Sequence, residues 1–309
     1  MHPAFSVLVF TVVSGAGYGL VFLMILGHLS GVTVLQDKTL LLSAGALSFV
    51  MISGGLLSST LHLANPKNAW RAFSRFKTSW LSREAVFAVA FYPFLLIYLL
   101  GVYLNGAEIS TVFAAAGWIT IVLAMITLFC TSMIYASLKT IRQWNSALTP
   151  VNYLALGLMS GSVLLLALQA LLGDVQSNLL QNSVLVLLSI GITVKVIYFF
   201  WIGKPSGSSI KTATGFTQAS VRLLDQGHSS NGFLNNEFGY TVAANKLLKI
   251  RFATLFVAFI LPMLLVCLGG SVLLVLASIA TIAGLLAERW LFFAEARHVV
   301  RLFHGDQTT

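Results

Sequence analysis

A histidine and a glutamate stand at the two ends of the segment HLANPKNAWRAFSRFKTSWLSRE, which runs from His62 to Glu84. Long apolar stretches lie on both sides, TLLLSAGALSFVMISGGLLSSTLHLA before it and EAVFAVAFYPFLLIYLLGVYL after it. Histidine titrates near neutral pH, and a carboxyl group at a water boundary can relay protons to it. If the two helix ends meet, His62 and Glu84 form a proton-exchanging pair at one membrane face. Such a pair suits a quinone headgroup, which takes up protons together with electrons.

A third ionisable group, Lys195, lies in the apolar run SIGITVKVIYFFWIG about two turns from the end of its helix. A lysine at this depth has two equally plausible roles. Its ammonium can reach along the helix to the membrane interface. Alternatively, it can lie near Glu84 or a bound oxyanion, because an ionisable residue inside a membrane usually has a functional partner.

The polar segment between His62 and Glu84 is itself patterned. Within NAWRAFSR, Trp70 and Phe73 are three residues apart, and Arg71 and Arg75 are four apart. This spacing predicts a short amphipathic helix that lies in the membrane interface after the apolar helix stops at Pro66. An interfacial anchor explains the aromatic residues, but it does not explain the histidine and glutamate at the two ends.

The composition places these residues in a membrane protein. The 309 residues are 58% hydrophobic and 9% charged, whereas soluble domains have about 25% charged residues. Eight apolar stretches are each long enough to cross a bilayer as a helix, which takes roughly 20 residues. We expect an all-α integral membrane bundle forming one domain over 1–309, with a long loop at 204–245. The expected spans are 4–29, 39–64, 84–104, 108–138, 151–173, 179–203, 247–269 and 271–298.

The net charge of +9 follows the predicted topology. All but two of the 18 Lys and Arg residues lie at one face of an eight-span bundle, in its connections or at the helix ends beside them, the exceptions being Lys38 and Lys195. Basic loops remain cytoplasmic, so we expect both termini, the segment between His62 and Glu84 and the loop 204–245 on the cytoplasmic side. This distribution argues against nucleic-acid binding and favours acidic lipid or an acidic partner.

Several other kinds of site are disfavoured. Cys130 and Cys267 lie in apolar helices without a CxxC pair, so neither an iron–sulfur cluster nor a zinc site can be assembled from them, and we expect buried free thiols. A bis-histidine haem is not expected, because His28 and His62 lie at opposite ends of their helices. We read His28 as an interfacial residue in water. No P-loop or paired-glycine nucleotide motif is present, and neither the inverted repeats of many transporters nor the polar rings of channels are visible.

Two helices carry small residues four positions apart, Gly15 and Gly19 in SGAGYG and Gly157 and Gly161 in GLMSG. Such spacing allows the backbones of neighbouring helices to approach closely, so we expect packing seams at both places. The loop 204–245 contains Phe216, Phe233, Phe238 and Tyr240. Because a long aromatic loop is often functional, we expect an ordered docking surface there.

These motifs together resemble a known family. HL-xx-P-xx-AWRAF and SWLSRE, the opening HPAFSV and GAGYG, and the closing ERWLFFAEARHVV resemble the membrane anchor subunits of DMSO-reductase-type molybdoenzymes. The start and end are most similar to the membrane subunits of quinone-linked sulfite dehydrogenases. The resemblance covers all eight spans, although Asn68 stands where the family often has arginine.

The resemblance implies a complex in the inner (plasma) membrane with a molybdopterin catalytic subunit and a ferredoxin-like iron–sulfur subunit, which hold those cofactors. It implies exchange with ubiquinone or menaquinone in the anchor, at the residues that match His62 and Glu84. It also implies that Arg71 and Arg75 contact quinone or the iron–sulfur partner. We therefore take Lys67, Arg71, Arg75 and Lys77 as candidate partner-docking residues, and His62, Glu84, Arg71 and Lys195 as candidates for quinone binding and proton transfer.

The predicted orientation favours the sulfite-oxidising type, whose catalytic subunits are cytoplasmic, over the DMSO-reducing type, whose catalytic subunits lie outside. Three alternatives remain open: an anchor that oxidises quinol to reduce an S- or N-oxide, a purely structural tether, and a stand-alone transporter.

Overall fold

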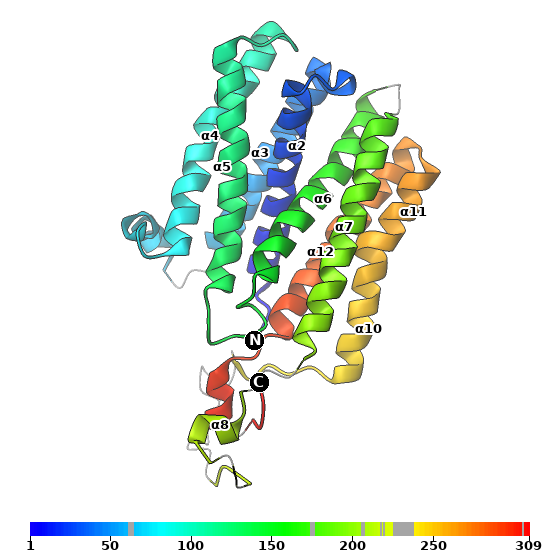
Figure 1. Ribbon diagram of the computed structural model, residues 1–309. Helices are drawn as coiled ribbons and strands as arrows, with labels where there is room; N and C mark the ends of the chain where they lie inside the picture. The colour runs from blue at the N-terminus through cyan, green and yellow to red at the C-terminus, as the bar shows by residue number, and fades with distance from the viewer. Residues whose placement is uncertain are drawn as a thin grey trace.

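The computed structural model describes residues 1–60, 65–173, 177–204, 208–216, 218, 220–224, 238–304 and 306–309. Within these residues the fold is helical, and the only β contacts are two isolated bridges (Figure 1). Eight helices are long and apolar enough to cross a membrane, as the sequence predicts. They are Phe5–Leu29, Lys38–Thr60 (α3), Trp80–Asn105 (α4), Thr111–Ala136 (α5), Leu148–Leu172 (α6), Asn178–Ile202 (α7), Ala244–Leu268 and Ser271–Ala294 (α12).

Two of these spans contain a π-helical turn. The first consists of α1 (Phe5–Val9), the π-turn η1 (Phe10–Ser14) and α2 (Gly15–Leu29), and the seventh of α10 (Ala244–Leu255), η4 (Phe256–Ile260) and α11 (Leu261–Leu268). Such turns insert an extra residue into a helix and often occur at functional sites. The shorter elements are η2 (Thr33–Gln36), η3 (Pro66–Arg75), α8 (Ile210–Thr214) and η5 (Val299–His304). The segment around Trp70 is thus helical as expected, although as a 3₁₀ helix.

The spans form two groups of four. A buried apolar cluster joins α2, α3, α4 and α5, and a second joins α6, α7, α11 and α12. A third cluster, at the end of the bundle near the N-terminus, joins Leu8 of the first span and Leu128 of α5 to Tyr153, Tyr198 and Phe292 of the second group, and therefore ties the two groups together there. Many large apolar side chains remain exposed on the outside of the helices, which is the surface that lipid chains cover.

The predicted glycine seams pack against each other and join the two groups. A Cβ atom added at Gly19 of α2 would lie 1.9 Å from the carbonyl oxygen of Gly157 in α6. One added at Gly161 would lie 2.2 Å from the carbonyl carbon of Gly19. The two backbones are therefore in direct contact, which no larger residue allows.

Replacing Gly161 with alanine should consequently destabilise the bundle by about 3 kcal/mol, the upper range for overpacking of a tight interior. The measurement is the unfolding midpoint in mixed dodecyl maltoside and SDS micelles. Gly54→Ala is the matched control, because a Cβ atom at Gly54 of α3 meets nothing within 4 Å. A loss of stability of the same size in both variants would contradict the seam.

Both chain termini lie at the same end of the bundle (Figure 1). The α-amino group of Met1 donates hydrogen bonds to the carbonyl oxygens of Phe293 and Ala296, at 3.2 and 3.0 Å. A cation is favourable at the C-terminal end of a helix, and here it fixes the N-terminus to α12. We expected this last span to extend to residue 298, but α12 ends at Ala294 and the chain then turns.

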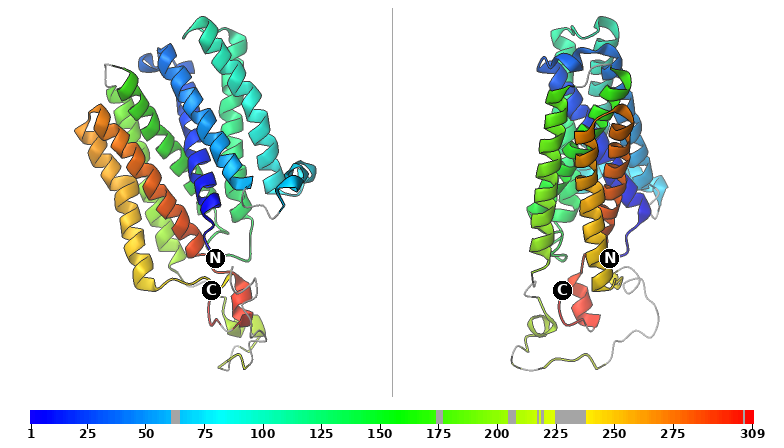
Figure 2. Two further views of the ribbon diagram at one scale, coloured as in Figure 1. Left: turned by 180° about the vertical axis from the view of Figure 1, so that it is seen from behind. Right: turned by 90° about the vertical axis from the view of Figure 1, so that its right-hand side faces the viewer.

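Beyond this end, α8 and the C-terminal segment form a small appendage (Figure 2). The backbone of Ile210 donates to Gln307, and Ser209 and Thr308 form a bridge. Of the loop aromatics expected to form a docking surface, Phe238 packs on His298, with ring centroids 4.7 Å apart, and Tyr240 contacts His2 and Trp290. Phe216 is exposed, and Phe233 lies outside the described residues. Phe238 and Tyr240 therefore contact the chain's own termini and α12.

Candidate functional site

Glu84 is the fifth residue of α4, which begins at Trp80, whereas the sequence suggested that it begins the helix. The helix starts earlier because the hydroxyl of Ser79 accepts a hydrogen bond from the backbone N–H of Ser82, which caps the first turn. The side chain of Glu84 is buried, with 4% exposure. Its carboxylate accepts a hydrogen bond from the hydroxyl of Thr131 on α5. The carboxyl group is therefore held in a fixed position between two helices of the first group.

Tyrosines from three helices lie in the neighbourhood of this carboxylate. Tyr18 of α2, Tyr135 of α5 and Tyr153 of α6 all lie within electrostatic range of Glu84. The rings of Tyr135 and Tyr153 stack, with centroids 6.0 Å apart and an interplanar angle of 25°. The hydroxyl of Tyr153 has no hydrogen-bond partner among the described residues. Glu84 thus interacts electrostatically with phenols from three helices, and its carboxylate is hydrogen-bonded to Thr131.

His62 lies outside the described residues, as do Leu61, Leu63 and Ala64. Its contact with Glu84 remains a prediction. The structure describes α3 up to Thr60, two residues before this histidine.

The segment that carries Lys67, Arg71, Arg75 and Lys77, called the basic segment below, folds against the first turn of α4. Ser82 donates its hydroxyl proton to the carbonyl oxygen of Ala72 and accepts from the backbone N–H of Arg75 at 3.1 Å. Arg83 donates to the carbonyl oxygens of Phe76 and Lys77, at 3.0 and 2.8 Å. Ser82 and Arg83 therefore position this segment. Neither role was predicted from the sequence.

The candidate docking residues are solvent-facing. They are Lys67, Arg71, Arg75 and Lys77, all exposed. Trp70 is 65% exposed beside them, and the guanidinium of Arg71 lies 5.8 Å from its ring centroid. Exposed basic and aromatic side chains side by side are typical of a membrane interface or a protein contact.

Lys195 of α7 is buried and does not reach the interface. Its ammonium forms an ion pair with the carboxylate of Glu288 on α12, and it lies 4.3 Å from the centroid of the Tyr198 ring. One of the two roles considered for it, the extension toward water, is therefore wrong. The structure gives Lys195 a charged partner within the second group of helices.

Glu288 also contacts its neighbour Arg289, with 3.3 Å between Oε2 and Nε. The guanidinium of Arg289 lies 3.7 Å from the ring centroid of Tyr153. Tyr153 is also in electrostatic range of Glu84, so it interacts both with the candidate site and with the cluster of Lys195, Glu288 and Arg289. Glu288 and Arg289 could have been suggested from the sequence, since a lysine inside a membrane requires a carboxylate nearby.

His28, expected in water, is instead buried at the other end of the bundle. Its Nε2 lies 2.9 Å from the carbonyl oxygen of Ala107 and must donate, so Nδ1 accepts from the hydroxyl of Tyr98 at 2.6 Å. The expectation failed because the connection from α4 to α5 folds over the end of α2. His28 therefore cross-links the first span to α4 and to this connection.

Within the described residues no three His, Cys, Asp or Glu side chains lie close enough together to hold a metal ion. Cys130 is buried as expected, whereas Cys267 is exposed on α11. An open groove lies on the outer surface of α7. It is lined by Leu185, Val186, Ser189, Ile190, Thr193 and Val194. It contains no ionisable side chain, so it offers no proton-exchanging group.

Comparison with known proteins identifies the family of this membrane bundle. The family model described as "DMSO reductase anchor subunit (DmsC)" matches residues 1–294. The chain belongs to this anchor subunit family. It is also 32% identical, over 98% of its own length and 99% of the relative's, to a subunit of the sulfite dehydrogenase of Allochromatium vinosum. The anchor is thus a membrane subunit of a DMSO-reductase-type complex, and both the resemblance and the eight apolar spans expected from the sequence are confirmed.

Proposed function

We propose that this anchor passes electrons between the iron–sulfur clusters of a ferredoxin-like partner and a membrane quinone, bound at the end of the bundle where Glu84 lies. The observation that carries the proposal is a buried carboxyl group just inside α4, directly beneath an exposed basic segment. A molybdopterin subunit in the same complex acts on the substrate.

The residues around Glu84 fit a quinone. When bound, this group supplies two-electron chemistry coupled to proton transfer at its two oxygens. Glu84 gives or takes a proton at its carboxyl oxygen, and Thr131 orients that carboxyl. Trp80, one turn before Glu84 on α4, packs edge-on against Phe129, and Phe87, one turn after it, packs against Phe76, so the neighbouring turns of the helix carry apolar rings that suit a quinone. His62 and Arg71 are the further residues that we assign to quinone binding.

We further propose that the complex oxidises sulfite in the cytoplasm. The supporting observations are the name of the relative and the position of both termini and the basic segment at one end of the bundle, since basic segments stay cytoplasmic. A second candidate is an anchor that oxidises quinol for a DMSO or other S- or N-oxide reductase. It is favoured by the description of the matched family.

Purification of the tagged anchor in mild detergent tests the proposal. We expect molybdenum and iron to co-purify, and a fluorescent quinone analogue to bind the complex and to bind more weakly after His62→Ala. Sulfite-dependent reduction of an artificial electron acceptor would select the first candidate, and quinol-dependent reduction of an S-oxide the second. A metal-free anchor that purifies alone would instead support a stand-alone transporter.

The exposed basic residues yield a separate prediction. Reversing the charge of Lys67, Arg71, Arg75 and Lys77 to glutamate should lower recovery of the iron–sulfur partner by about tenfold or more, because complementary charge aids association. The iron content of the purified anchor measures this recovery. Lys38→Glu is the control, since Lys38 begins α3 at the opposite end of the bundle. Full iron recovery after the fourfold reversal would place the docking surface elsewhere.

A further inference from the structure

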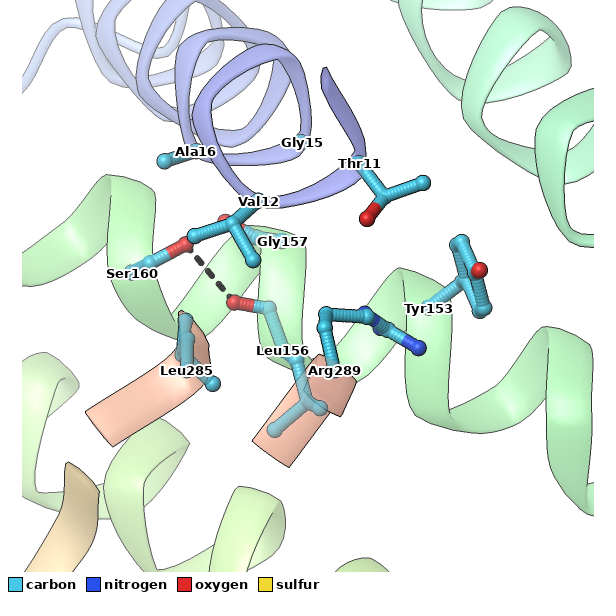
Figure 3. Close-up of a pocket in the computed structure, with 10 residues that line it drawn as sticks. All are labelled: Thr11, Val12, Gly15, Ala16, Tyr153, Leu156, Gly157, Ser160, Leu285 and Arg289. Atoms are coloured by element: carbon cyan, nitrogen blue, oxygen red, sulfur yellow. Dashed lines mark hydrogen bonds between the residues drawn. The ribbon is translucent and has the colours of Figure 1, made fainter. Parts of the chain in front are cut away.

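A small cavity lies between the first span, α6 and α12. Figure 3 shows Thr11 of the π-turn η1, Tyr153 of α6 and Arg289 of α12 together on one side of it. Both Arg289 and Tyr153 are almost fully buried, at 4% and 2% exposure. The Nη1 atom of Arg289 and the hydroxyl of Tyr153 have no hydrogen-bond partner among the described residues. Two strong hydrogen-bonding groups therefore border the same buried space.

The cavity begins where the direct contact of the glycine seams ends. Gly157 of α6 takes part in both, because its carbonyl oxygen faces Gly19 of α2 and its backbone also lines the cavity. On the first span the lining passes from Gly15 of α2 into η1, where the π-turn inserts an extra residue into the helix. Neither glycine has a side chain that could fill the space. The close contact between the two groups of helices is therefore replaced here by a small opening.

Arg289 brings a partly neutralised charge to this opening. Its Nε lies 3.3 Å from Oε2 of Glu288, and the same carboxylate also pairs with Lys195. A guanidinium stays charged in proteins and has five N–H donors, and a buried charge is costly unless it is paired and hydrogen-bonded. The Nη1 atom of Arg289 therefore needs an acceptor, and the cavity that Arg289 lines is the space that can hold one.

A water molecule meets this need. The cavity has room for about one, and a buried water is bound by about two to four polar partners. Its oxygen can accept from Nη1 of Arg289 and from the hydroxyl of Tyr153. It can donate to the hydroxyl oxygen of Thr11, because Thr11 gives its own proton to the backbone of its helix, at 3.0 Å from the carbonyl of Val7. One water thus offsets the cost of two unpaired buried groups.

We propose that this cavity holds one ordered water molecule, bound by Arg289, Tyr153 and Thr11, which joins the first span to α6 and α12. The three side chains come from three helices and from both groups, since α2 packs in the first group and α6 and α12 in the second. The water continues, as a polar joint, the contact that the paired glycines make directly. It belongs to the packing of the bundle and requires neither a quinone nor a partner subunit.

Radiolytic footprinting of the purified complex, read by mass spectrometry, tests the water directly. Radiolysis converts an ordered internal water into hydroxyl radicals, so a side chain beside it is oxidised although bulk solvent does not reach it. We expect oxidation of Tyr153. Tyr198 is the matched control, because it is also 2% exposed but its hydroxyl donates to the carbonyl oxygen of Gln143 at 2.8 Å, and it should remain unmodified. Oxidation of both tyrosines to the same extent, or of neither, would overturn the water site.

Tyr153→Phe provides a second measurement through the sign of its effect on stability. If a water bonds the hydroxyl, its removal should raise the unfolding equilibrium constant in mixed dodecyl maltoside and SDS micelles by about fivefold, the effect of one hydrogen bond. In a dry cavity the same change removes an unsatisfied hydroxyl and should lower that constant. Tyr198→Phe loses a hydrogen bond that the structure shows and should raise it. A constant that is unchanged or lower in Tyr153→Phe alone would contradict the proposal.

A double variant shows whether one ligand is shared. The hydroxyl of Tyr153 makes no hydrogen bond to Thr11 or to any other described residue, so a bound water is what would couple the two side chains. Thr11→Val combined with Tyr153→Phe should therefore raise the unfolding constant by less than the product of the two single effects, because the second change acts on a water that is already lost. Effects that multiply fully would mean that the two residues bind no common water.

Discussion

Replacing Glu84 with glutamine should lower quinone-linked turnover of the complex by a factor of about 10²–10⁴, the usual contribution of a positioned acid or base. Glutamine has nearly the same shape and keeps an oxygen that can accept the hydrogen bond from Thr131. It cannot exchange a proton. Reduction of an artificial acceptor directly by the partner subunits should remain at the wild-type rate, because that reaction bypasses the anchor.

Two variants separate the chemistry of Glu84 from its packing. Glu84→Asp retains a carboxyl group and should restore part of the quinone-linked rate. Glu108→Gln removes an exposed carboxylate at the other end of α4 and should have no effect. The molybdenum and iron contents of each preparation verify assembly. A fully assembled Glu84→Gln complex with normal quinone-linked turnover would show that the anchor does not use this carboxyl group.

The membrane helices were predictable because their signal is local. A run of about 20 apolar residues indicates a transmembrane helix and little else. The paired glycines of α2 and α6 could likewise be recognised from their spacing alone. The sequence did not show that these two seams face each other, although both were identified. Helix ends were less certain, and Ser79 shows why. Because the Ser79 side chain caps the helix, α4 begins at Trp80, before the apolar run, and Glu84 lies inside the helix instead of at its start.

The polar contacts were harder to predict because their partners are distant in the chain. His28 and Tyr98 are 70 residues apart, and Lys195 and Glu288 are 93 apart. A lysine within an apolar helix indicates that some partner exists, but composition does not say whether that partner is Glu84, a ligand or Glu288. That choice depends on which helices pack together, and here α7 lies with α12 in the second group. The contact between His62 and Glu84 is of the same kind and remains a prediction.

The ion pair of Lys195 and Glu288 leads to the largest expected effect on stability. Glu288→Gln would leave Lys195 and Arg289 without their shared carboxylate in a buried site. Removing one partner of a buried ion pair typically costs about 3–5 kcal/mol. Unfolding in mixed dodecyl maltoside and SDS micelles measures this loss. Glu295→Gln is the matched control on the same side of the bundle. Its partner Arg251 is 26% exposed, so the cost should be about 1 kcal/mol or less.

A double variant shows whether the loss comes from charge. In Lys195→Met with Glu288→Gln, one of the two unpaired cations is gone, so the double variant should be more stable than Glu288→Gln alone. This sign is opposite to what packing defects at both sites would give, because a second packing defect does not restore stability lost to the first. Equal or greater instability in the double variant would mean that Glu288 contributes to stability through packing and not through its charge.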